Sequence, residues 1–384
     1  MRALRWSLAI VMLLGACTSA GSTVSSSTPT GTVTQPSTTP PPVGAVLADG
    51  TSLPAGCAKG ATASQTVAFV SAGRAWALDP RTNALSCLFA VRDPGPFAWG
   101  PQGDRVLLAD LRVRGVAADA PNLPPIDAQT TAFGWGHPNG LAVVYADGPG
   151  VPDKRFMDDG SVETLSALPA GTYLQIVYHP SGLALAFVVE HAGKQAIWFS
   201  TNEGQEPERL VFGLHGTTFT SLAFSPDGQR LWWIAEHAQG YPELHWMDLG
   251  DRTGFTDVWR GSNDTIAQGL EVSPSGRYQS MTQGADCADH RALIVQGGAA
   301  SAAMPFEERP TTALGWLDTT HVLVAAGGCG AQTELFSADA GGGQPVALVS
   351  GTELAAPRTV LRNAPDTVPA PNSSEGQPPL GGVG

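Results

Sequence analysis

The sequence predicts an all-β chain that folds as a β-propeller of seven four-stranded blades, and three observations support this prediction. One short turn occurs six times, its copies follow one another at a period in the low forties, and short apolar strands joined by tight turns fill the stretches between them. The copies lie at residues 99–103, 136–140, 178–182, 224–228, 272–276 and 316–320. Their central positions are 37, 42, 46, 48 and 44 residues apart. A repeat of this length made of short strands is typical of propeller blades.

The first unit lies before the first copy of the turn and has no innermost strand of its own. Residues 66–70 and 74–79 give its second and third strands. We expect residues 358–361, an apolar extended segment near the C-terminus, to supply the missing strand and close the ring. A closed ring leaves no free sheet edge. Six and eight blades stay open as alternative counts.

The clearest blade covers residues 218–261. Its four expected strands are residues 220–224, 230–234, 243–248 and 256–259. Between the first two strands, Pro226 fixes φ of the turn and Gly228 supplies a conformation that other residues avoid. The same order of strands and turns is repeated around residues 183–199 and 333–342.

The N-terminus predicts export and anchoring at a membrane. Arg2 and Arg5 precede an apolar stretch at residues 6–14, which is too short to span a bilayer as a helix. Residues 14–17, Leu-Gly-Ala-Cys, resemble a bacterial lipobox. This resemblance implies a signal peptide over residues 1–16 and a lipid on Cys17, which would hold the protein on the extracytoplasmic face of the cell membrane. An ordinary secretory signal with a chance cysteine is the alternative.

Two segments flank the predicted propeller, which we place at residues 46–363. Residues 17–45 begin with Cys17 and continue as a Ser-, Thr- and Pro-rich stretch without charge, which predicts a disordered tether. An O-glycosylated stalk is the alternative for this segment. Residues 364–384 have a similar composition and are predicted to be a disordered tail.

The charge of the chain excludes some classes of partner. Without Arg2 and Arg5, 19 basic residues stand against 34 acidic residues, so the net charge of the mature chain is near −15. This charge argues against binding to nucleic acid and against electrostatic attachment to an anionic membrane. The basic residues are nearly all Arg, which, with abundant Ala, Gly and Pro, is typical of a GC-rich bacterial genome.

Four cysteines besides Cys17 predict two disulfides in an exported protein. Cys287 and Cys329 fall in equivalent loops of the sixth and seventh blades, and Cys57 and Cys87 both lie near the first blade. We therefore expect the pairs Cys57–Cys87 and Cys287–Cys329. A metal site formed by cysteines and His290 is the alternative.

The repeat also carries a family resemblance. The Phe-Ser-Pro-Asp-Gly turn at residues 224–228, with a later Asp-Gly type of turn in the blade, is similar to the WD40-like repeats of TolB-type propellers. The first unit, which has no such turn, and the last, which has Asp318-Thr319-Thr320 in its place, depart from the pattern. The resemblance implies the propeller fold and a function through protein contacts.

Acidic residues and histidines recur in the loops between second and third strands, which lie on one face of a propeller. The candidate residues are Glu190, His191, Glu236, His237, Asp289 and His290. Three imidazoles with acidic neighbours would suit a metal such as zinc or a polar ligand. The simpler interpretation is that these are polar loops inherited by duplication of blades. His137 and His179 occupy the Ser position of the repeated turn, where we expect them to form turn hydrogen bonds.

We assign no catalytic residue and no cofactor, because familiar catalytic motifs such as Gly-x-Ser-x-Gly and His-Glu-x-x-His are missing from the sequence. The favoured hypothesis is a lipid-anchored, monomeric scaffold that binds a protein of the cell envelope. One alternative is a hydrolase or lyase of the envelope that uses the Glu-His loops for acid–base chemistry. The other is a receptor for a metal or a small molecule at the same loops.

Overall fold

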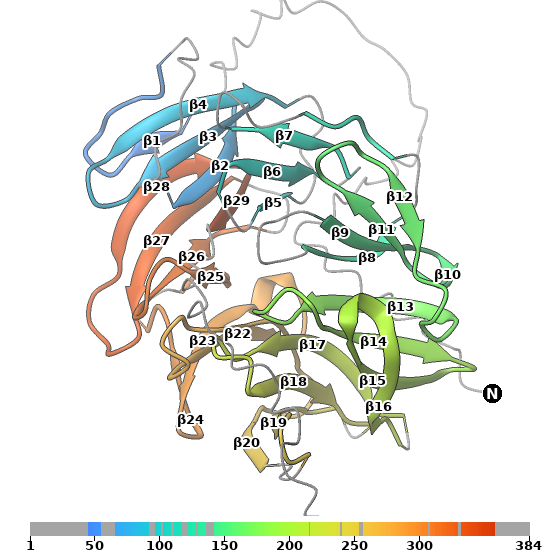
Figure 1. Ribbon diagram of the computed structural model, residues 1–384. Helices are drawn as coiled ribbons and strands as arrows, with labels where there is room; N and C mark the ends of the chain where they lie inside the picture. The colour runs from blue at the N-terminus through green and yellow to red at the C-terminus, as the bar shows by residue number, and fades with distance from the viewer. Residues whose placement is uncertain are drawn as a thin grey trace, which may run out of the picture.

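The computed structural model describes the greater part of the predicted propeller. The described residues are 45–54, 66–91, 97–100, 103–108, 111–116, 122–126, 130–135, 142–214, 216–238, 240–252, 256–305, 308–328 and 332–357. They form seven antiparallel sheets arranged as blades around a ring, so the predicted seven-bladed propeller is confirmed (Figure 1). Among these residues, no helix has the length and apolar character that a membrane crossing requires.

The blades follow one another along the chain, and in most of them the strands run in chain order from the inner edge to the outer edge of the sheet. Blade 1 takes its inner strand from the last described strand, and blade 7 takes its outer strand from the first. Blade 1 contains β29 (Leu354–Pro357), β2 (Val67–Ser71), β3 (Arg74–Asp79) and β4 (Ala84–Ala90). Blade 2 contains β5 (Phe97–Trp99), β6 (Arg105–Leu108) and β7 (Val113–Gly115). Blade 3 contains β8 (Thr130–Trp135), β9 (Ala142–Asp147), β11 (Asp153–Phe156) and β12 (Val162–Thr164). Blade 4 contains β13 (Gly171–Tyr178), β14 (Leu185–His191), β15 (Lys194–Thr201) and β16 (Gln205–Phe212), with β10 (Pro149–Gly150) paired to β13 and the short helix η1 (Asn202–Gly204) before β16.

The remaining three blades are built in the same way. Blade 5 contains β17 (Thr218–Phe224), β18 (Arg230–Glu236), β19 (Pro242–Asp248) and β20 (Thr256–Arg260). Blade 6 contains β21 (Ile266–Val272), β22 (Gln279–Gly284), β23 (Arg291–Gln296) and β24 (Ala299–Ala302), with the short helix η2 (Cys287–Asp289) before β23. Blade 7 contains β25 (Thr311–Trp316), β26 (His321–Ala326), β27 (Thr333–Asp339), β28 (Val346–Thr352) and, at its outer edge, β1 (Val46–Leu47).

The two ends of the propeller are fastened to different blades. The C-terminal strand β29 pairs with β2 through four residue pairs, from Val67 with Pro357 to Val70 with Leu354, and so closes the ring. The prediction of a closing C-terminal strand is confirmed. The strand that the structure describes begins at Leu354, four residues before the expected segment, and residues 358–361 lie outside the described part of the chain. The reason for the earlier start is a short connection: β28 ends at Thr352, and the backbone N–H of Glu353 already donates to Val70 O at 2.8 Å.

The N-terminal strand β1 forms a second closure on blade 7. It pairs with β28 through Val46 with Ser350 and Leu47 with Val349. The buried hydroxyl of Ser71, at the end of β2, accepts from Ala45 N at 2.9 Å and donates to Gly351 O at 3.0 Å. The side chain of Ser71 in blade 1 therefore joins Ala45, directly before β1, to Gly351 in strand β28 of blade 7.

The hydrophobic core lies between neighbouring blades. Between blades 4 and 5, Phe219, Leu231 and Trp233 pack with Val188 and Ile197 in one buried cluster. Side chains alternate along each strand, so the odd-numbered positions of β18 contact blade 4, whereas the even-numbered ones contact blade 6. The two faces of blade 5 therefore contact different neighbouring blades.

The repeated turn has the expected hydrogen bonds. In blade 5, Gly228 N donates to Ser225 O at 2.8 Å, and Gly228 has a φ of 72°. In blade 4, His179 replaces the serine, and its Nδ1 accepts from Ser181 N at 3.0 Å, as predicted for this position. Its Nε2 also donates to Gly228 O of blade 5 at 3.0 Å, so the side chain joins two blades. His137 lies outside the described residues.

Candidate functional site

The Glu-His loop of blade 4 is a tight hairpin whose histidine faces water. Glu190 and His191 end β14, and Ala192 and Gly193 form the turn with φ values of 51° and 71°. Glu190 Oε2 accepts from Gln195 Nε2 at 3.3 Å, whereas the His191 side chain is exposed. Glu190 is therefore bound within its own blade.

The corresponding residues of blade 6 are arranged differently. Asp286 precedes the short helix η2, and its Oδ1 accepts from the N–H groups of Ala288 and Asp289 at 2.8 and 3.2 Å. Asp289 is exposed, and burial lowers the pKa of the neighbouring His290. In blade 5, burial raises the pKa of Glu236, the first acidic residue of its loop.

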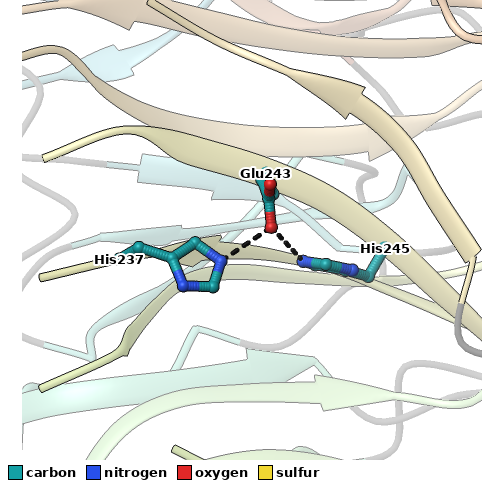
Figure 2. Close-up of side chains that lie close together, drawn as sticks. All are labelled: His237, Glu243 and His245. Carbon is teal, nitrogen blue, oxygen red and sulfur yellow. Dashed lines mark hydrogen bonds and ion pairs between the residues drawn. The ribbon is translucent and has the colours of Figure 1, made fainter. Parts of the chain in front are cut away.

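Within the part of the chain that the structure describes, the group suited to hold a metal ion is His237, Glu243 and His245, all from blade 5. Their nearest ligand atoms all lie within 4.8 Å of one another. His237 Nε2 is 2.7 Å and His245 Nε2 is 3.6 Å from the same carboxylate oxygen, Glu243 Oε2 (Figure 2). Of the three histidines that we expected to share one face, His237 belongs to this group, and its partners come from its own blade.

Glu243 and His245 were not recognised as candidates from the sequence, although a signal was present. Both residues fall in the segment predicted as the third strand of blade 5, at positions separated by two. Side chains at such positions lie on the same face of a strand. A carboxylate and an imidazole on one face, directly after a loop with a histidine, would have indicated the group.

Three further side chains hold this group in place. The ring of Trp233 stacks on His245 with centroids 5.5 Å apart, and the ring of Tyr241 lies 4.9 Å from that of His237. Arg260, opposite Glu243 on β20, places Nε 3.8 Å from Glu243 Oε1 and its guanidinium 3.5 Å from the Tyr241 ring centroid. The two oxygens of the Glu243 carboxylate therefore have different partners: Oε1 faces Arg260, and Oε2 faces the two imidazoles.

An exposed apolar pair lies where blade 4 continues into blade 5. Phe212 ends β16 and is 38% exposed, and Leu214 follows with 58% exposed. The charged groups of Lys194 and Arg209 lie 5.8 and 5.2 Å from the centroid of the Phe212 ring. Phe212 therefore lies beside two cations, and Leu214 is exposed two residues further along the chain.

Several predicted modification sites are not covered by the structure. Cys17 belongs to residues 1–44, which lie outside the described residues, so the lipid anchor stays a prediction. Cys87 is buried in β4 and Cys287 begins η2. Their expected partners, Cys57 and Cys329, lie outside the described residues, and both pairings stay predictions.

Comparisons with known proteins show similarity at the level of the fold. No protein-family model matches this chain, and no curated protein matches it at a significant level. A prolyl endopeptidase structure has a TM-score of 0.54 at 11% identity and covers 75% of this chain and 50% of its own. An oligogalacturonate lyase from Vibrio parahaemolyticus has a TM-score of 0.52 at 10% identity, covering 75% and 86%. TolB from Acinetobacter baumannii has a TM-score of 0.45 at 13% identity, covering 76% and 65%.

These likenesses show a shared β-propeller and nothing finer, because propellers of one fold carry unrelated activities. The chain spans less than two thirds of the TolB and endopeptidase chains named above. The structural resemblance to TolB is therefore a resemblance of fold at low identity.

Proposed function

We propose that this chain is a lipid-anchored β-propeller of the cell envelope that binds another protein. The lipobox-like residues before Cys17 support the anchor and its extracytoplasmic position. The closed ring supports a binding role, because a disc fastened at both ends of its chain presents preformed surfaces at little entropic cost.

The observation that carries the proposal is the apolar pair Phe212 and Leu214. Both side chains are exposed, whereas most of the large apolar residues that the structure describes are buried between blades. Lys194 and Arg209 lie beside Phe212. Exposed apolar side chains that are bordered by polar or charged groups are typical of protein contact sites. A partner that offers an apolar side chain with nearby carboxylates would match this surface.

Site-specific photo-crosslinking in the native membrane tests the binding role. We expect a photoreactive residue at Leu214 to capture one envelope protein, and Phe212→Ser to reduce that product strongly. Val346, which is 62% exposed on blade 7, is the matched control position. The same products at both positions, or a product that Phe212→Ser leaves unchanged, would contradict the proposed surface.

The anchor is tested separately from the binding surface. Cys17→Ala should abolish incorporation of labelled fatty acid and move the protein out of the membrane fraction, because the acyl chains supply the membrane affinity. A variant that stays in the membrane fraction without label would refute lipidation at Cys17.

A further inference from the structure

We propose that His237, Glu243 and His245 form a binding site for one divalent transition-metal ion, with Zn²⁺ as the best match. The site belongs to the face of blade 5 that contacts blade 4, and it does not depend on the apolar pair described above. Its ligands would be the two Nε2 atoms and Glu243 Oε2, which already lie close together.

The spacing of these atoms fits a tetrahedral ion. Bonds of about 2.0–2.1 Å at tetrahedral angles place neighbouring ligand atoms about 3.3 Å apart. The observed separations from Glu243 Oε2 are 2.7 Å to His237 and 3.6 Å to His245, one shorter and one longer than this value. To admit an ion, the first separation would widen and the second would narrow, while the three ligand atoms already lie within 4.8 Å of one another.

The strand and the loop that carry the ligands restrict their movement. Glu243 and His245 share one face of β19, whose backbone is paired on both sides, with β18 and β20. The loop that carries His237 is closed by His237 N donating to Tyr241 O at 3.0 Å and by Gly240 N donating to His237 O at 2.7 Å. Ligands that are positioned before an ion arrives lose little freedom when they bind it.

The surroundings provide the support that metal ligands need. Stacking on Trp233 fixes the ring plane of His245, and Tyr241 packs against His237. Arg260 contacts the other oxygen of the Glu243 carboxylate, which orients it, and the arginine side chain is 57% exposed, so water screens its charge.

The donor set indicates which ion would bind. Imidazole nitrogen suits Zn²⁺, Cu²⁺ and Ni²⁺, and two histidines with one carboxylate form a common three-ligand zinc set with a fourth position for water. The side chains of His237, Glu243 and His245 are 27%, 12% and 12% exposed, so solvent reaches the group without surrounding it. Hard cations such as Mg²⁺ and Ca²⁺ prefer oxygen ligands and should bind poorly.

Isothermal titration calorimetry with Zn²⁺ alone tests the site, using protein that has no polyhistidine tag and has been stripped with a chelator. We expect one ion per chain in the wild type, and an affinity reduced about 10-fold or more by His245→Ala and by Glu243→Gln. His191→Ala, which removes an exposed histidine from the neighbouring loop, is the matched control and should leave the affinity unchanged.

Co²⁺ provides a second readout that depends on ligand geometry. We expect visible absorption bands of tetrahedral Co²⁺ in the wild type and their loss in His237→Ala, a loop substitution that leaves the strands intact. No zinc binding by the wild type, equal affinity in the wild type and His245→Ala, or loss of binding in His191→Ala would each overturn the proposal.

Discussion

Replacing Glu271 with Gln should make the protein more stable at neutral and alkaline pH while leaving its stability in acid unchanged. Glu271 lies in β21, the innermost strand of blade 6, and its backbone O accepts from Trp316 Nε1 at 3.4 Å. Burial raises the pKa of its carboxyl from 4.5 to about 7. The folded protein therefore holds this proton more tightly than the unfolded chain does.

The size of the effect follows from that difference. The pKa of Glu271 rises by about 2.5 on folding, and each pKa unit corresponds to about 1.4 kcal/mol, which gives about 3 kcal/mol. Between about pH 4.5 and pH 7 the folded state binds more protons than the unfolded state. The free energy of unfolding of the wild type therefore falls as pH rises through this window, and Glu271→Gln removes that loss.

Urea unfolding of the wild type and of the variant, from about pH 4 to about pH 8, measures this difference. We expect equal midpoints at the acidic end and a higher midpoint for Glu271→Gln at the alkaline end. Glu163→Gln, on the exposed strand β12, is the matched control. A difference between wild type and Glu271→Gln that is the same at every pH, or a variant that is less stable at the alkaline end, would refute the reasoning.

Three other predictions concern the turns and the closure of the ring. Gly228→Ala should lower the free energy of unfolding by about 2–3 kcal/mol, because a left-handed φ is strained for Ala and its Cβ would collide with the His179 ring. Gly193 has a similar φ but open space around it, so Gly193→Ala should lower the free energy of unfolding by about 1 kcal/mol. Calorimetry of both variants measures the difference. Burial lowers the pKa of His179, so the wild type should lose stability as pH falls below about 6.5, and His179→Gln should weaken this acid dependence in thermal melts; an unchanged slope would contradict it. A chain ending at Glu353 lacks β29 and should melt far lower by circular dichroism than one ending at Pro357, and equal melting temperatures would show that β29 does not close the ring.

The local parts of the fold were predictable from the sequence, and blade 5 shows why. Strands expected at 220–224, 230–234, 243–248 and 256–259 are observed as β17 to β20 with ends that differ by at most two residues. Alternation of apolar residues and the Pro-Asp-Gly turn are properties of adjacent residues, so they are visible without knowledge of the fold.

Contacts between distant parts of the chain were predicted less well. The closing strand was placed at residues 358–361, because the sequence shows an apolar segment but not the length of the connection from β28. The histidines of three loops were grouped because their blades are adjacent. The structure instead gathers His237 with Glu243 and His245, since the register of β18 with β19 decides which side chains meet.

The way in which the two ends are fastened determines where mechanical load enters the protein. Any tension that arrives from the N-terminal side reaches β1 before it reaches β2, and β1 is held by two residue pairs to β28, with Ser71 binding Ala45 at its base. The four pairs between β29 and β2, which complete the circle, lie further along that path. If the chain is tethered as proposed, a pull on the tether would detach β1 from β28 first, and the four pairs that close the ring would bear the load only afterwards.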